Sequence, residues 1–141
     1  MFQVGLESAP AVMSATKPTI YVVDDDVGVL GSLRFLLEAE GFVVRTFRSG
    51  GAALNAPDPS EVDCFVIDYK MPDINGLDLV RRLRSRGVEA PAILITGVPD
   101  KTIATRAEAA GVKHVLRKPL LEDSLVKQIR GAIEEHRPTA L

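Results

Sequence analysis

Residues 19–26 read Thr-Ile-Tyr-Val-Val-Asp-Asp-Asp, so a short apolar run ends abruptly in three adjacent carboxylates. A β-branched run of this length is typical of a strand that is buried on both faces of a sheet. Three neighbouring negative charges repel one another, and a buried charge is costly unless something pairs it. Either the rest of the chain supplies a counter-charge, or these residues form a solvated turn.

The same order, an apolar strand followed by a helix, occurs five times along the chain. The expected strands are 19–24, 42–47, 63–68, 92–96 and 114–117, and the expected helices are 27–41, 50–56, 76–87, 100–111 and 121–136. Asp26 is the expected N-cap of the first helix, and Gly41 ends that helix. Apolar strands that alternate with helices predict an α/β fold: a doubly wound parallel sheet of five strands with helices on both faces.

The 141 residues suffice for one domain, expected at 18–136 between an N-terminal tail at 1–17 and a C-terminal tail at 137–141. The net charge of −2 argues against a nucleic-acid surface, which usually has a strongly basic balance. Four arginines lie at 81–86, on the polar side of an expected helix, and a solvated face is the expected reason.

The one cysteine, Cys64, lies in an apolar run and is expected in the core, which fits a reduced, cytoplasmic setting. No apolar run approaches the ~20 residues that span a membrane. No basic residue precedes Lys17, so the N-terminal stretch does not resemble a signal peptide. These features predict a cytoplasmic protein without a membrane segment.

Polar side chains gather where the expected strands end, and ligands of doubly wound sheets bind at that edge. The second strand, followed by Arg-Ser-Gly, offers nothing obvious there. The other four strands end in these residues: Asp24, Asp25 and Asp26; Asp68; Thr96 and Gly97; Lys118 and Pro119.

Carboxylates at one sheet edge form a hard-oxygen site that suits Mg²⁺. Asp24, Asp25 and Asp68 together carry three negative charges, which one divalent ion and Lys118 would cancel. Such a site also suits phosphoryl transfer: the Asp68 carboxylate would attack phosphorus and the metal would neutralise developing charge. Lys118 and the Thr96 hydroxyl would each bind a phosphoryl oxygen, and Gly97 would leave the approach open.

Four motifs, "VVDDD", "VIDYKMPDINGLDLV", "ILITG" and "LRKPL", resemble in this order the receiver domain of two-component response regulators, and the second is similar to receivers of the FixJ type. The resemblance implies the flavodoxin-like strand order 2-1-3-4-5. It implies that Asp68 is the phosphoacceptor, Thr96 the switch hydroxyl and Lys118 the phosphate-binding lysine, with a cis peptide bond between Lys118 and Pro119. Asp24, Asp25 and the backbone carbonyl of Lys70 are then the further Mg²⁺ ligands.

The resemblance also implies partners. A sensor histidine kinase or a histidine phosphotransfer protein would supply the phosphoryl group, and with no output domain in the chain the signal would pass to a downstream protein target. A homodimer through the face formed by 100–111, 114–117 and 121–136 is a further expectation. The protein would thus be a stand-alone receiver and not a metabolic enzyme.

Two alternatives remain. One is an interaction module that works without phosphorylation. The other is a phosphatase of the haloacid dehalogenase type, which also uses an aspartate nucleophile and Mg²⁺. Those enzymes carry a second aspartate two residues after the nucleophile, where this chain has Lys70.

The chain departs from the receiver pattern at Val115, where receivers commonly carry a tyrosine or phenylalanine. A valine has one stiff torsion and a small area, so it cannot fill and vacate a pocket as a ring does. We therefore expect a smaller or filled cavity behind Thr96. Helix 100–111, with Ile103 as its one large apolar residue, is the expected carrier of the signal.

Overall fold

The computed structural model describes residues 16–56, 61–97, 100–120 and 122–136. The tails expected at 1–17 and 137–141 lie outside these residues, apart from Thr16 and Lys17.

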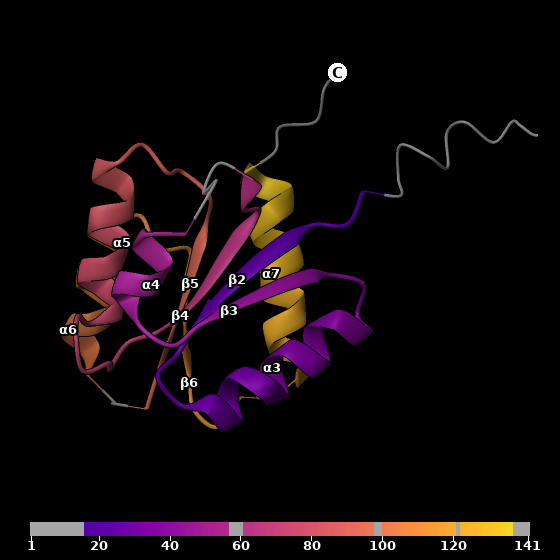
Figure 1. Cartoon of the computed structure of the whole chain (residues 1–141). Coiled ribbons are helices and arrows are strands. Elements are labelled where there is room, and N and C mark those ends of the chain that lie inside the picture. The colour runs from indigo at the N-terminus through magenta and orange to yellow at the C-terminus, as the bar shows by residue number, and fades with distance from the viewer. Residues whose placement is uncertain (1–15, 57–60, 98–99, 121, 137–141) are drawn as a thin grey trace, which may run out of the picture.

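Five parallel strands form one sheet in the middle of the molecule (Figure 1). The strands are β2 (Thr19–Val23), β3 (Val43–Phe47), β4 (Cys64–Asp68), β5 (Ala92–Thr96) and β6 (His114–Arg117). Their order is β3-β2-β4-β5-β6, and every neighbouring pair is parallel. In chain order this is 2-1-3-4-5, which confirms the predicted topology.

Helices cover both faces of the sheet. They are α3 (Val27–Ala39), α4 (Gly50–Leu54), α5 (Gly76–Ser85), α6 (Lys101–Ala109) and α7 (Glu122–His136). In Figure 1, α4, α5 and α6 lie on one side of the sheet, and α3 and α7 lie on the other. The predicted doubly wound fold is confirmed.

The core has two layers, because successive residues of a strand point to opposite faces of the sheet. In β2, Ile20 and Val22 belong to the apolar cluster beneath α3 and α7, whereas Tyr21 and Val23 belong to the cluster beneath α4, α5 and α6. All five residues of β4 are buried. Cys64 is among them, in the core as expected.

The four arginines of α5 and its C-cap do not all lie on a solvated face, so that expectation is wrong for Arg84. This side chain is half-buried, and burial lowers the pKa of its guanidinium. Its Nη1 donates to the carbonyls of Val88 and Ala90, each at 2.9 Å, and its Nη2 donates to the Gly111 carbonyl at 3.4 Å. Arg84 therefore joins the end of α5 to the turn that follows α6.

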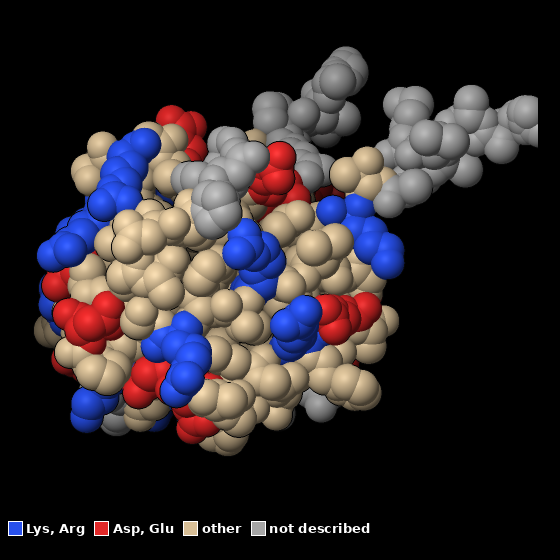
Figure 2. Space-filling view, in the orientation of Figure 1, with Lys and Arg blue, Asp and Glu red and all other residues tan. Residues whose placement is uncertain are grey.

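Charges of both signs are interspersed on the face that Figure 2 shows, where Lys and Arg side chains lie beside Asp and Glu. This pattern agrees with the small net charge of −2. Among the residues that the structure describes, no helix combines the length and the apolar character needed to cross a bilayer.

Candidate functional site

The predicted site residues come together at the edge where the parallel strands end. Asp24 follows β2, Asp68 ends β4, Thr96 ends β5 and Lys118 follows β6. The Lys118 Nζ lies 3.0 Å from Asp68 Oδ1 and 4.0 Å from Asp24 Oδ2. The counter-charge that the acidic run requires is therefore supplied by a lysine far away in the sequence.

Three carboxylates form a compact cluster beside this lysine. One ligand oxygen each from Asp24, Asp25 and Asp68 can be chosen so that all lie within 4.8 Å of one another. Asp24 and Asp68 are buried, whereas Asp25 is exposed. Mg²⁺ prefers oxygen ligands and keeps several waters, so an oxygen cluster that opens to solvent on one side fits this ion.

The three adjacent aspartates have different surroundings. Asp24 Oδ1 accepts a hydrogen bond from the backbone N–H of Asp26 at 2.8 Å, and the Asp24 N–H donates to the Phe47 carbonyl at 3.0 Å. Asp26 caps α3, because its Oδ1 accepts from the N–H groups of Gly28 at 2.8 Å and Val29 at 3.2 Å. The buried carboxylate of Asp24 is thus held in place, as a metal ligand requires. The Asp26 carboxylate is instead engaged in capping α3.

The electrostatics of the cluster favour binding of a cation. Burial raises the pKa of Asp24 and of Asp68. This effect outweighs the hydrogen bond from the Asp26 N–H, which lowers the pKa of Asp24, and the hydrogen bond from Lys118, which lowers the pKa of Asp68. Partial burial by itself lowers the pKa of Lys118, but the hydrogen bond and charge of Asp68 outweigh it and raise that pKa. The ionised carboxylates therefore carry a desolvation cost that one lysine does not offset, and a bound cation would reduce it.

Thr96, Gly97 and the segment after β6 complete this edge. The Thr96 side chain is buried, and the backbone carbonyl of Thr96 accepts a hydrogen bond from the Lys118 backbone N–H at 2.9 Å. A Cβ added at the exposed Gly97 would meet nothing nearer than Lys118 Cδ at 4.0 Å. The Lys118–Pro119 peptide bond is cis. Val115 is partly buried and packs against the cluster beneath α4, α5 and α6.

Lys70 is exposed in the loop between β4 and α5, two residues after Asp68. The preceding residue, Tyr69, makes a contact that sequence reasoning missed: its hydroxyl accepts from Arg106 Nη2 on α6 at 3.3 Å. No periodicity or motif connects residues so far apart in the sequence, so only the fold reveals this link between the loop and α6.

The segment after β3 makes a contact that the sequence did not predict. The N–H groups of Gly50 and Gly51, just after β3, donate to the carboxylate of Asp73 in the loop that carries Lys70. Two consecutive glycines after a strand were the available signal, since such residues allow another segment to approach closely.

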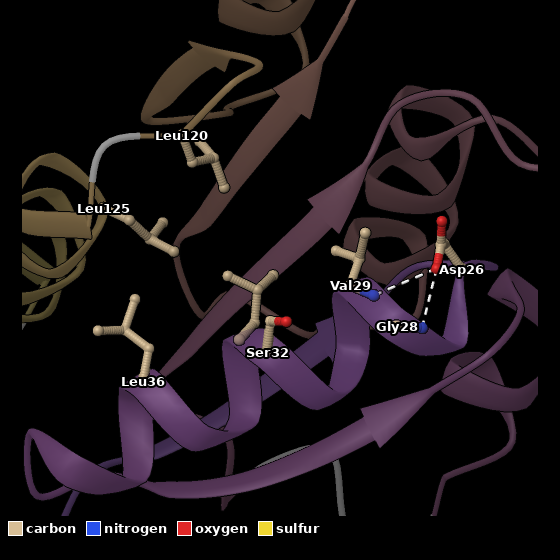
Figure 3. A pocket seen from close by; sticks show the side chains of 8 residues that line it. Asp26, Gly28, Val29, Ser32, Leu36, Leu120 and Leu125 are labelled. Atoms are coloured by element: carbon tan, nitrogen blue, oxygen red, sulfur yellow. Dashed lines mark hydrogen bonds between the residues drawn. The ribbon is translucent and has the colours of Figure 1, made fainter.

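An open apolar groove of about 540 Å³ lies between α3 and the segment that leads into α7 (Figure 3). Asp26 and Gly28 stand at one end, where the acidic run enters α3. Leu120, two residues after Lys118, contributes from the opposite wall. The other lining residues are Val29, Ser32, Leu33, Leu36 and Leu125.

Comparisons with known proteins agree with this arrangement. The model of the response regulator receiver domain matches residues 20–130. The transcriptional regulatory protein FixJ of Bradyrhizobium diazoefficiens is 36% identical over 125 residues, which are 89% of this chain and 61% of FixJ. The response regulator protein TodT of Pseudomonas putida is 36% identical over 86% of this chain and 54% of its own length. The chain thus spans little more than half the length of these curated relatives.

Solved structures give the same result. A response regulator receiver domain protein from Clostridium thermocellum superposes with a TM-score of 0.80 at 30% identity, over 84% of this chain and 96% of its own. The response regulator StyR does so with a TM-score of 0.79 at 35% identity, over 85% of this chain and 61% of its own. Sequence, topology and strand-end chemistry agree, and the chain belongs to the family of response regulator receiver domains, which signal in two-component systems through phosphorylation on aspartate.

Proposed function

We propose that Asp68 is the phosphoacceptor and that it takes the phosphoryl group from a phosphohistidine of a sensor histidine kinase or a histidine phosphotransfer protein. A carboxylate oxygen of Asp68 would attack phosphorus while the bond from phosphorus to the imidazole nitrogen breaks, which leaves an aspartyl phosphate and a free histidine. The observation that carries the proposal is the 3.0 Å contact of Lys118 Nζ with Asp68 inside the carboxylate cluster.

We assign the remaining roles by position. Asp24, Asp25, Asp68 and the backbone carbonyl of Lys70 would hold Mg²⁺, which when bound neutralises charge on the phosphoryl oxygens. Lys118, already beside the nucleophile, would bind one phosphoryl oxygen as a point charge. The Thr96 hydroxyl would donate to another.

The two alternatives are weaker. A phosphatase of the haloacid dehalogenase type needs an acid and base two residues after the nucleophile, and Lys70 at that position does not act as one. A module that works without phosphorylation would have no need for two buried carboxylates beside a lysine. Burying these charges costs stability, and such a module would gain no function in return.

The groove of Figure 3 supports a protein as the phosphoryl donor. Asp26 and Leu120, on its two walls, follow Asp25 and Lys118 closely in the sequence, so a helix seated in the groove would bind near the segments that carry the proposed site. The apolar lining, with Val29, Leu36 and Leu120, suits an amphipathic helix of that partner.

The direct test is incubation with phosphoramidate and Mg²⁺, followed by measurement of base-labile phosphate on the protein. We expect incorporation by the wild type, none by Asp68→Asn, and none when Mg²⁺ is chelated. Asp26→Asn is the matched control, because asparagine caps a helix as well as aspartate does and Asp26 lies outside the cluster. Full-rate labelling of Asp68→Asn, or full-rate labelling without the metal, would refute the proposal.

We further propose that the signal leaves through α6 and not through Val115, toward a protein target or a second copy that binds the face of α6, β6 and α7. α6 buries just Ile103 and Ala107, so small forces suffice to shift it. Amide-exchange maps with and without beryllofluoride test this. Exchange should change in α6, and a change confined to β6 would contradict the proposal.

A further inference from the structure

The loop between β4 and α5 is held at its middle by α4. Asp73 Oδ2 accepts from the Gly51 N–H at 2.9 Å, and Asp73 Oδ1 accepts from the Gly50 N–H at 3.4 Å. These bonds join segments that are 22 and 23 residues apart in the sequence. They hold the pKa of Asp73 below its usual value, so the carboxylate is charged and accepts strongly.

Shape complementarity accompanies these hydrogen bonds. Gly50 is buried, and a Cβ added there would collide with Cγ2 of Ile74. Ile74 in turn packs against the core cluster beneath α4, α5 and α6. The loop is therefore fixed by a carboxylate and by an adjacent apolar side chain. We call this contact, made by Gly50, Gly51, Asp73 and Ile74, the loop seat.

The helix that provides the loop seat is itself anchored. Ser49 caps α4, with its hydroxyl accepting from the Ala52 N–H at 3.1 Å. At the other end of α4, Arg86 Nη1 donates to the Leu54 carbonyl at 2.8 Å. Because α4 is tied at both ends, the loop seat is part of the framework and can position what rests on it.

Both ends of the loop are fixed as well. The Tyr69 N–H donates to the Ile95 carbonyl at 2.8 Å, and the Gly76 N–H donates to the Tyr69 carbonyl at 2.7 Å. Lys70, whose carbonyl is the proposed backbone ligand, thus lies between the anchored Tyr69 and the loop seat. Met71, which follows Lys70, is buried in the core cluster, so the loop seat adds a second restraint between Lys70 and the start of α5.

We infer that Asp73 is a positioning residue of the metal site, which fixes the loop so that the Lys70 carbonyl is ready for the cation. This inference rests on the proposed function. Groups that orient metal ligands are worth 10–100-fold in metal affinity in typical cases. A ligand that must be ordered at the moment of binding lowers affinity, because the ordering entropy is then lost on binding.

The first test is the Mg²⁺ affinity of the whole chain, measured by NMR shift titration with no phosphoryl donor present. We expect Asp73→Ala to bind Mg²⁺ about tenfold more weakly than wild type. Asp73→Asn removes the same charge but keeps an oxygen that accepts from Gly51, so its loss should be clearly smaller. Equal losses in both variants would mean a long-range charge effect and would overturn the inference.

The second test leaves Asp73 untouched. Gly50→Ala should also weaken Mg²⁺ binding, because the new methyl group displaces Ile74. Adding Ile74→Ala removes the colliding methyl group and should restore part of the affinity. Gly31→Ala is the matched control: it also adds one methyl group to a helical glycine, but nothing lies within 4 Å of the new Cβ, and it should bind Mg²⁺ as the wild type does.

The outcomes separate the inference from the proposed function. A wild-type chain that neither binds Mg²⁺ nor takes up phosphate would refute the function. A wild-type chain that does both, with unchanged Mg²⁺ affinity in Asp73→Ala, would refute the inference alone. Asp73 is exposed, so this variant should fold even if Gly50→Ala does not.

Discussion

α5 and α6 lie on the same face of the sheet and are nearly equal in length, yet they are held very differently (Figure 1). α5 buries Gly76, Leu77, Leu79, Val80 and Leu83, whereas α6 buries Ile103 and Ala107. Each fully buried large side chain contributes about 1.5–3 kcal/mol. α5 follows the strand of Asp68 and α6 follows the strand of Thr96. The side of Asp68, the proposed nucleophile, is therefore firmly packed, and the side of Thr96, the proposed switch residue, is loosely packed.

The start of each helix shows the same contrast. Gly76, the first residue of α5, lies so close to β4 that an added Cβ would be 2.5 Å from the Asp68 carbonyl. α6 begins after Asp100, an exposed N-cap whose Oδ1 accepts from the Thr102 N–H at 2.8 Å. The firm side holds Asp68, the proposed phosphoacceptor, in place, while the loose side would be free to respond if Asp68 is phosphorylated.

The largest expected difference in stability between the two sides comes from adding one methyl group to each. Gly76→Ala should lower the free energy of unfolding by about 2–4 kcal/mol, because its Cβ would meet the Asp68 carbonyl and two core side chains. Gly97→Ala, where a Cβ has room, should change it by less than about 0.5 kcal/mol. Urea unfolding measures both. Equal losses of stability in the two variants would contradict the difference in packing between the α5 side and the α6 side.

The next effect concerns cooperativity. Leu79→Ala and Ile103→Ala should each cost about 2–5 kcal/mol locally, since both side chains are fully buried. Leu79→Ala should lower global stability, because the other buried residues keep α5 attached. Ile103→Ala removes the one large anchor of α6, so native-state amide exchange should accelerate in α6 far more than in β4. Uniform acceleration in both variants would argue against a loosely held α6.

A smaller effect tests the charge on the firm side. The pKa of Asp68 is raised by folding, so the folded protein binds a proton more tightly than the unfolded chain. Stability from this group is then greatest below the unfolded pKa of about 3.8 and falls as pH rises through the higher folded pKa. At pH 7 without Mg²⁺, Asp68→Asn should be more stable than wild type by about 1 kcal/mol.

That advantage should shrink as the pH falls, because the wild-type carboxyl then gains its proton. Thermal melts of the two proteins over a pH series measure it. A destabilised Asp68→Asn at pH 7 would mean that Lys118 compensates the buried charge fully.

The smallest effect is at the link between the two sides. Tyr69→Phe removes the hydroxyl that accepts from Arg106, an exposed bond of 3.3 Å that should contribute less than about 0.5 kcal/mol. Global stability should not change measurably, but amide exchange around Arg106, in the last turn of α6, should rise about twofold. Unaltered exchange would show that Tyr69 does not restrain α6.

Local pattern was enough to predict the parallel sheet and the gathering of Asp24, Asp68, Thr96 and Lys118, and the resemblance to a known family added the order of the strands. The apolar strands have no alternation and the order of motifs resembles a known family, so each strand end was placed without a structure. The Gly50 and Asp73 contact, the Arg84 bonds and the Tyr69 contact with Arg106 could not be predicted. Each joins residues from separate loops or helices, and such pairs leave no periodicity in the sequence.

The bonds of Arg84 have a mechanical consequence for α6. Because Nη2 of Arg84 holds the Gly111 carbonyl, the C-terminal end of α6 is hinged to the firmly packed α5. The N-terminal end of α6 has the exposed cap of Asp100 and, one turn further on, the buried side chain of Ile103. A displacement of α6 would therefore be transmitted through the Gly111 turn to Arg84 and the C-terminal end of α5.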